Sequence, residues 1–198
     1  TSLLESMIGM LDFQAARFTV AGEIPGQEGN HHPTMRPMGL YPTRDGAINV
    51  AAPWGRLWEA CCRVLGLEEL LSDPRFATIR DRASHRDELD RALALRLRTR
   101  DTHAWLEALH AAGVPCGPVN DVGQVFADPQ VVHLGMAVPV EDPVRGPIRI
   151  LRNATRIEGH DPAIRQPAPV AGQHSSAILR QFGFAEDEIA GLVEQGIV

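Results

Sequence analysis

The sequence contains no lysine, because all 19 of its basic residues are arginine. This absence excludes Schiff-base chemistry on a lysine amine, and it excludes a P-loop, whose lysine holds a nucleotide's phosphates. Acidic residues number 25, which gives a net charge of -6 at pH 7. An acidic chain without a basic stripe repels a phosphate backbone, so we do not expect nucleic acid as a partner.

Cysteine and long apolar runs are also scarce. Only three cysteines are present, and two of them, Cys61 and Cys62, are adjacent. They cannot form an even, spaced disulfide framework, so we expect a reducing compartment, the cytoplasm. No apolar run approaches the ~20 residues that cross a bilayer, and the first residues lack the features of a secretion signal. We therefore expect no membrane role.

The remaining composition is that of a globular protein, with 44% hydrophobic and 22% charged residues. The length of 198 residues suffices for one domain or for two small lobes. The sequence opens with Thr1 rather than Met, and apolar residues at helical spacing follow at once. We therefore expect it to begin inside a larger protein.

Local patterns predict a mixture of helices and short strands. Apolar residues at helical spacing predict helices over residues 2–20, from beyond Pro53 to Gly66, over 82–98 and over 102–112. Asp45 and Gly46 suit a tight turn and predict a hairpin of strands 40–43 and 47–52. Thr102 is the expected N-cap of its helix, and Gly113 is the expected left-handed stop.

The second half of the chain has frequent proline and glycine and little periodic apolar surface. It predicts short helices over 122–127 and 130–134, strands over 136–140 and 148–151, and closing helices over 175–182 and 186–194. A segment of this kind is expected to wrap around another lobe rather than to form its own core.

Residues 22–39 are the best candidate for a functional site. The segment is rich in Gly, Pro and His and has too few apolar residues for a core of its own, so it must rest on other surfaces. Composition alone leaves a solvated connector equally open. The adjacent His31 and His32 do not indicate a metal, because neighbouring side chains diverge and no Cys or His recurs at zinc-ligand spacing.

Cys116 lies between two prolines and beside Gly117. A fixed loop of this kind can hold a reactive thiol, but the sequence identifies no partner base. A small buried thiol at a turn is therefore the favoured interpretation. Cys61 and Cys62 fall on or beside the apolar stripe of a predicted helix and are expected in the core.

An ordered series of short motifs runs along the chain. Its members are Gly29-Asn30-His31-His32-Pro33, Asp45-Gly46, Trp58, Asp73-Pro74-Arg75-Phe76, Ala112-Gly113-Val114-Pro115-Cys116-Gly117-Pro118-Val119, Asp128-Pro129-Gln130-Val131, Arg145-Gly146-Pro147, Ala168-Pro169 and Gly172-Gln173-His174-Ser175. In this order they resemble the family III CoA-transferases, the group that includes formyl-CoA transferase and carnitine CoA-transferase, over nearly the whole chain. The family usually has Gly-Glu-His-Thr in the last motif, so Gln173 and Ser175 are departures in a segment expected to be structural.

The resemblance implies an acyl-CoA:carboxylate CoA-transferase that works by covalent catalysis. An aspartate attacks the acyl-CoA thioester, forms an enzyme-bound mixed anhydride and releases CoA thiolate, and a second carboxylate then takes the CoA. In the family this aspartate belongs to the N-terminal half, upstream of Thr1. We therefore expect no catalytic residue in this chain, acyl-CoA and a carboxylic acid as substrates, and neither a bound cofactor nor a metal.

The resemblance also implies a loop that covers the substrate. In related enzymes a glycine-rich loop closes over the anhydride, and the corresponding segment here is 29–37. The expected substrate-covering residues are Gly29, Asn30, His31, His32, Pro33 and Arg36. The loop has fewer glycines than that of formyl-CoA transferase, which implies a different acyl group or a less mobile loop. Arg36 is expected either to pair with a substrate carboxylate or to face water.

The architecture implied by the resemblance is α/β, with an α+β small domain and a Rossmann-like large domain in an interlocked homodimer. Residues 1–24 would be a connecting helix, 25–112 the small domain, and 113–198 a C-terminal segment that returns to the large domain. The expected partners are the N-terminal half of the same enzyme and a second copy of the chain.

Two other functions stay open. An α-methylacyl-CoA racemase of the same superfamily would also carry its general bases upstream of Thr1. A non-catalytic assembly module that binds a separate N-terminal chain is the third interpretation. A CoA-transferase is the favoured one, and this chain alone is expected to be inactive because it lacks the nucleophile.

Overall fold

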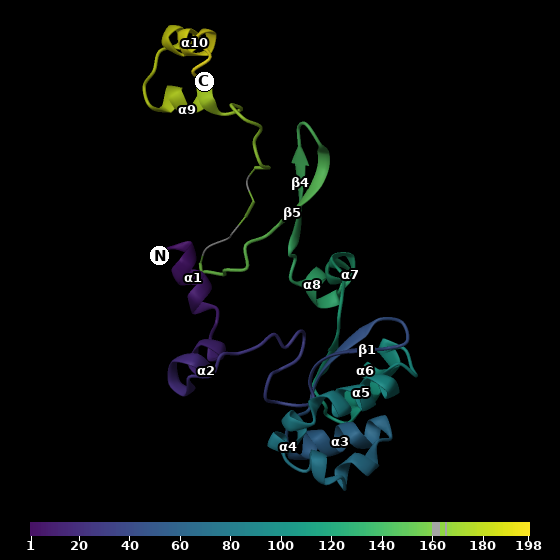
Figure 1. Cartoon of the computed structure of the whole chain (residues 1–198). Coiled ribbons are helices and arrows are strands. Elements are labelled where there is room, and N and C mark those ends of the chain that lie inside the picture. The colour runs from purple at the N-terminus through teal and green to yellow at the C-terminus, as the bar shows by residue number, and fades with distance from the viewer. Residues whose placement is uncertain (160–162, 165) are drawn as a thin grey trace. The chain divides into compact units, whose positions relative to one another are not determined.

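A computed structural model of the protein describes residues 1–159, 163, 164 and 166–198 (Figure 1). The chain divides into two compact units, Thr1–Val119 and Asn120–Val198. Helices and short strands mix in both, in agreement with the predicted α/β class. No helix in the described ranges is long and apolar enough to cross a membrane.

The first unit is built around a three-stranded antiparallel sheet. Strands β1 (Met38–Pro42) and β2 (Ala47–Ala51) form the hairpin that Asp45 and Gly46 predict. A third strand, β3 (Cys116–Pro118), pairs with β2 and gives the order β1-β2-β3. The sequence predicts a turn at this place, because three residues that include glycine and proline show no alternating pattern.

Helices α3 to α6 gather beside this sheet (Figure 1). Helix α3 (Gly55–Leu65) buries its predicted stripe, and Gly66, at φ 64°, ends it in the left-handed conformation. The core consists of Tyr41, Ile48, Val50, Ala52, Trp58, Cys61, Cys62, Leu65, Leu70, Phe76, Leu89, Leu93, Leu97, Trp105, Leu109 and Val114. Each large apolar side chain buried in this way stabilises the unit by about 1.5–3 kcal/mol before entropy is counted.

Two predicted helices are each broken in two. The helix expected over 2–20 consists of α1 (Leu3–Gly9) and α2 (Phe13–Ala21), separated at Asp12, which has φ 46°. The helix expected over 82–98 begins earlier, as α4 (Ile79–Ser84), and continues as α5 (Arg86–Leu97) after His85 leaves helical geometry. The prediction missed both breaks because the apolar spacing continues across them.

Smaller elements complete the first unit. The short segments after α3 are the 3-10 turns η1 (Glu68–Leu71) and η2 (Pro74–Phe76). Helix α6 (Thr102–Ala111) is followed by Gly113 at φ 71°, as predicted, but Asp101 rather than Thr102 is its N-cap. The Asp101 side chain makes no capping hydrogen bond. Instead, Asp45 Oδ1 of the hairpin turn accepts hydrogen bonds from Thr102 N at 2.7 Å and Thr102 Oγ1 at 2.8 Å. These bonds lower the pKa of Asp45.

The second unit contains the elements that the sequence predicts. They are α7 (Val122–Ala127), α8 (Pro129–His133), the antiparallel pair β4 (Ala137–Asp142) and β5 (Gly146–Leu151), α9 (Ser175–Gln181) and α10 (Glu186–Glu194). Among the described residues of this unit, the buried side chains are Asp142 and Ile189. A unit with so little buried apolar surface does not have a core of ordinary size.

The predicted division of the chain differs from the division by contacts. Residues 113–119 group with the first unit, because β3 adds a strand to its sheet. Residues 1–24 group with the first unit as well. The return of residues 113–198 to a large domain remains a prediction, and positions 160–162 and 165 of that range lie outside the described residues.

Candidate functional site

An open pocket of about 760 Å³ lies in the first unit, where the 22–39 loop meets the sheet and the start of α2. It is lined by Phe13, Gln14, Gly26, Glu28, Gly29, Asn30, His31, His32, Pro33, Met38, Gly39, Asn49, Ala51, Pro115, Cys116, Gly117 and Pro118. Five of the six predicted loop residues therefore line one pocket, and the sixth, Arg36, does not. The missed strand β3 supplies the opposite wall.

Backbone hydrogen bonds close the loop on itself at the edge of β1. His32 N donates to Met38 O at 2.8 Å, and Leu40 N donates to Asn30 O at 3.0 Å. The Arg36–Pro37 peptide bond within the closed segment is cis. Pro37 O accepts a hydrogen bond from Ala52 N at 2.9 Å, which attaches the loop to the residue after β2. The loop is therefore held by backbone pairing rather than by an apolar core.

His31 packs inward against the strand residues. Its ring meets the Tyr41 ring edge-on, with centroids 5.1 Å apart, and its Nδ1 atom lies 3.9 Å from Asp90 Oδ2. Gly39 makes room for the ring, because a Cβ atom at that position would lie 2.3 Å from Nδ1. Nδ1 is buried and has no hydrogen-bond partner. The ring is thus fixed by shape, with one nitrogen turned toward a carboxylate.

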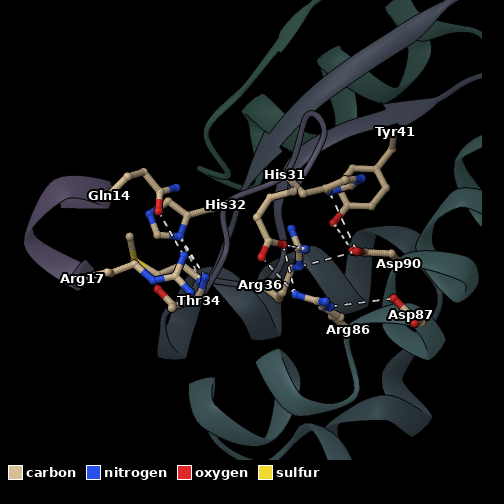
Figure 2. A network of polar contacts seen from close by, with 12 residues as sticks. Gln14, Arg17, His31, His32, Thr34, Arg36, Tyr41, Arg86, Asp87 and Asp90 are labelled. Atoms are coloured by element: carbon tan, nitrogen blue, oxygen red, sulfur yellow. Dashed lines mark hydrogen bonds and ion pairs between the residues drawn. The ribbon is translucent and has the colours of Figure 1, made fainter. Parts of the chain in front are cut away.

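His32 points to the other side of the loop, as the prediction for adjacent side chains requires (Figure 2). Its Nδ1 atom accepts hydrogen bonds from Thr34 N at 3.2 Å and Met35 N at 3.1 Å, and its ring stacks on Phe13. Burial, Arg36 and Arg17 lower the pKa of His32. The ring is therefore neutral at pH 7 with its proton on Nε2, because Nδ1 serves as the acceptor.

Arg36 is buried, contrary to the expectation that it faces water or a substrate. Its side chain is 3% exposed, and its Nε atom lies 3.4 Å from Asp90 Oδ2 while Nη2 lies 3.7 Å from Glu28 Oε2. Arg86 of α5 donates to both Glu28 oxygens, at 3.2 and 3.0 Å. Figure 2 shows Arg36 between the loop and α5. The two carboxylates offset part of the free-energy cost of taking the guanidinium out of water.

Asp90 joins this network to the core. Tyr41 donates its hydroxyl hydrogen to Asp90 Oδ1 at 2.8 Å. Burial, together with the Asp90 carboxylate, raises the pKa of Tyr41 well above its ordinary range. The phenol therefore remains a hydrogen-bond donor at neutral pH, and it holds one carboxylate oxygen while the other faces Arg36.

Arg82 holds the loop through a hydrogen bond to the backbone carbonyl of Arg36. Arg82, which begins the helix predicted over 82–98, is 2% exposed, and its cation lies over the Trp58 ring. Its guanidinium donates to three backbone carbonyls, Arg36 O at 2.9 Å, Phe76 O at 2.8 Å and Pro53 O at 2.6 Å. Burial lowers the pKa of Arg82. One side chain thus joins the loop, η2 and the end of β2.

The thiols offer no activated nucleophile. Cys61 and Cys62 lie in the core, as predicted, and burial raises the pKa of Cys61 to about 12. Cys116 is half-buried in the pocket wall, and burial also raises its pKa above the ordinary 9.0, so it is a thiol at neutral pH. Within the described ranges, no group of three or more His, Cys, Asp or Glu side chains is placed to hold a metal ion.

The network of Glu28, Tyr41, Arg86 and Asp90 was missed by sequence reasoning. Tyr41 and Asp90 are 49 positions apart, so no local spacing connects them. One signal was present: Arg86 and Asp90 are four residues apart and share a helix face. Such a spacing is also typical of an exposed charged helix face, and nothing local indicates that a polar loop covers it.

The site as a whole suits binding better than bond-making. The pocket presents amides, imidazoles and backbone groups, and the carboxylate in its wall, Glu28, is engaged by two arginines. Asp90 is engaged by Tyr41 and Arg36. A nucleophilic carboxylate must be free to attack, so neither of these two groups is suited to that role.

The comparisons with known proteins agree on one family. A family model described as CoA-transferase family III matches residues 1–175. Human succinyl-CoA:glutarate CoA-transferase is 31% identical over 198 residues, which is 100% of this chain and 45% of the human protein. Acetyl-CoA:oxalate CoA-transferase from Acetobacter aceti is 30% identical over 186 residues, which is 93% of this chain and 46% of that protein.

A solved structure agrees with these matches. The crystal structure of a CAIB/BAIF family protein from Brucella suis superposes with a TM-score of 0.76 and 31% sequence identity, covering 91% of this chain and 46% of that one. The chain therefore spans about half the length of the relatives that it matches.

Proposed function

The chain belongs to CoA-transferase family III, and from this premise we propose that it is the C-terminal part of an enzyme that moves CoA from an acyl-CoA to a carboxylic acid. The observation that carries the proposal is that relatives matching along nearly all of this chain bear the names of CoA-transferases. The pocket under the 22–39 loop gives this chain a place in that reaction.

The proposed reaction has two exchanges. A carboxylate oxygen on the N-terminal polypeptide attacks the thioester carbon, the C–S bond breaks with its electron pair on sulfur, and an anhydride and CoA thiolate result. The thiolate then attacks the enzyme-side carbonyl of the anhydride, which forms an enzyme-bound CoA thioester and releases the donor carboxylate. The acceptor carboxylate attacks this thioester to give a second anhydride and CoA thiolate, and the thiolate attacks the acceptor carbonyl, which forms the new acyl-CoA and frees the enzyme carboxylate. This chain contributes no atom to these bonds. Its role is to enclose the anhydride, because water would hydrolyse it.

The six loop residues Gly29, Asn30, His31, His32, Pro33 and Arg36 are proposed to form this cover. Five of them line the pocket directly. Arg36 acts from behind the loop, where it is fixed between Glu28 and Asp90. The proposed cover is accordingly a fixed wall rather than a freely moving glycine loop, because its charged groups are paired to α5.

The acceptor is proposed to be a dicarboxylic acid. The names of the relatives include glutarate, oxalate and D-citramalate as CoA acceptors or partners of exchange. The pocket fits a carboxylate in one respect: its own acidic wall residue, Glu28, is neutralised by Arg36 and Arg86, so it does not repel an anion.

The assembly is proposed to require an N-terminal half and a second copy of the enzyme, in the interlocked arrangement of a homodimer. Residues 25–112 would then serve as the small domain and 113–198 as the segment returning to the large domain. A cytoplasmic location also belongs to the proposal, since three free cysteines suit a reducing compartment. No observation favours the racemase or the assembly module over CoA transfer.

Complementation tests the proposal. We expect this chain alone to give no CoA transfer from succinyl-CoA to glutarate, because it lacks the nucleophile, and we expect transfer to appear when the N-terminal half of the same enzyme is supplied. Formation of glutaryl-CoA is followed by chromatography. Turnover by the chain alone, or none by the assembled halves with any of several acyl-CoA and carboxylate pairs, would contradict the proposal.

A further inference from the structure

His31 is the pocket residue whose contacts are least explained by packing. Its Nδ1 atom is buried without a hydrogen-bond partner, which lowers stability because the lost hydration is not replaced. A phenylalanine ring would make the same edge-on contact with Tyr41 and would bury no polar atom. Packing alone therefore does not account for an imidazole at this position.

The orientation of the ring leaves one nitrogen for the pocket. Nδ1 is turned inward, toward Asp90 Oδ2 at 3.9 Å, and a quarter of the side chain remains exposed. The ring lines the pocket, and Nε2, unlike Nδ1, is not among the buried side-chain atoms that have no hydrogen-bond partner. Gly39 and Tyr41 hold the ring from two sides, which leaves it little freedom to turn away.

We propose that His31 is a specificity-determining residue that hydrogen-bonds the carboxylate of the CoA acceptor through Nε2, and that Asp90 positions its ring from behind. This inference rests on the proposed function. A carboxylate offers only acceptor oxygens, so the bond requires a proton on Nε2. In the complex the imidazole stands between the substrate carboxylate and Asp90, whose Oδ2 lies 3.9 Å from Nδ1.

The surroundings of the ring favour an anion at this place. The charged groups around it are Asp90, Arg36, Glu28 and Arg86, two of each sign, and the carboxylates are already engaged by the arginines and Tyr41. The guanidinium of Arg36 retains two buried nitrogens, Nε and Nη1, without hydrogen-bond partners. These four charges balance one another, so an arriving carboxylate does not meet a free negative charge beside His31.

The test uses the enzyme assembled with its N-terminal half and the variant His31→Phe. We expect the KM for the carboxylate acceptor to rise about tenfold or more, the KM for acyl-CoA to stay unchanged, and kcat to stay within about threefold, because one hydrogen bond to the acceptor is lost. His31→Gln, which keeps a donor, should recover part of the affinity. Asp90→Asn should raise the same KM by a smaller factor. His103→Phe, at an exposed site on α6, is the matched control.

A purely structural role for His31 predicts a different pattern. The melting temperature of His31→Phe would fall, and kcat and both KM values would change together; that result would overturn the proposal. We expect instead a melting temperature equal to or above that of the unaltered protein, since the variant removes a buried unpartnered nitrogen.

Titration of this chain with glutarate, followed by NMR of the imidazole signals, separates the inference from the proposed function. A shift of the His31 signal without one at His103 supports the carboxylate site even if no CoA transfer is found for any assembled enzyme. Transfer activity combined with an unshifted His31 signal and an unchanged acceptor KM in His31→Phe would leave the function standing and refute the inference.

Discussion

Replacing Arg82 by methionine is expected to lower the free energy of unfolding of the first unit by about 3–5 kcal/mol. The guanidinium donates to Arg36 O, Phe76 O and Pro53 O in a buried setting, and methionine keeps most of the volume but none of the donors. Three buried carbonyls then lose a charged donor, and each such loss is costly. Urea unfolding of the two proteins, monitored by tryptophan fluorescence, measures the difference.

Arg80→Met is the matched control for this experiment. Arg80 lies on the same helix, α4, but its side chain is exposed. The substitution should change the free energy of unfolding by no more than about 0.5 kcal/mol. If Arg82→Met cost less than about 1 kcal/mol, the role of Arg82 in joining the loop to η2 and β2 would be wrong.

Replacing Gly39 by alanine is expected to displace the covering loop and to cost about 1–3 kcal/mol of stability, because the site has no space for another atom. The added Cβ atom would lie 2.3 Å from His31 Nδ1 and 2.8 Å from Asn30 O. The second contact is with backbone, which cannot turn aside as a side chain does. We expect the assembled enzyme to lose most of its activity and the His31 imidazole signal to move in NMR spectra of this chain.

Gly117→Ala provides the comparison. Gly117 lines the same pocket from β3, and a Cβ atom there would meet nothing within 4 Å. This variant should retain stability and the His31 signal. Equal behaviour of the two alanine variants would show that the close packing of His31 on Gly39 does not set the position of the loop.

The parts of the fold that the sequence predicted are those with a repeated local signal. Helix α3 was predicted from an apolar stripe that includes Trp58 and Cys61, and its end from Gly66, which adopts the left-handed conformation. Strand β3 and the breaks at Asp12 and His85 were missed. Strand β3 forms because its residues pair with β2, which lies far away in the sequence. A segment of three residues is too short to show the alternating pattern that predicts a strand.

The sequence indicated the loop of the candidate site but not how that loop is held, and its role as a functional site stays a prediction. The composition of residues 22–39 indicated a loop that must rest on other surfaces, and five of its named residues do line a pocket. The loop rests on charges rather than on apolar surface, since Arg36 is buried between Glu28 and Asp90. A single arginine in a polar loop looks the same in sequence whether it is buried or solvated. Arg36 is buried because the loop lies against α5, where Asp90 pairs with it.

Mass spectrometry of the acylated enzyme tests the central claim most directly, namely that this chain shapes the pocket while the bond-making carboxylate lies on another polypeptide. The assembled halves are incubated with acyl-CoA, quenched with hydroxylamine to trap the anhydride, and digested. The account predicts a hydroxamate on an aspartate of the N-terminal half and none on residues 1–198. A hydroxamate on any carboxylate of this chain, Glu28 and Asp90 included, would contradict it.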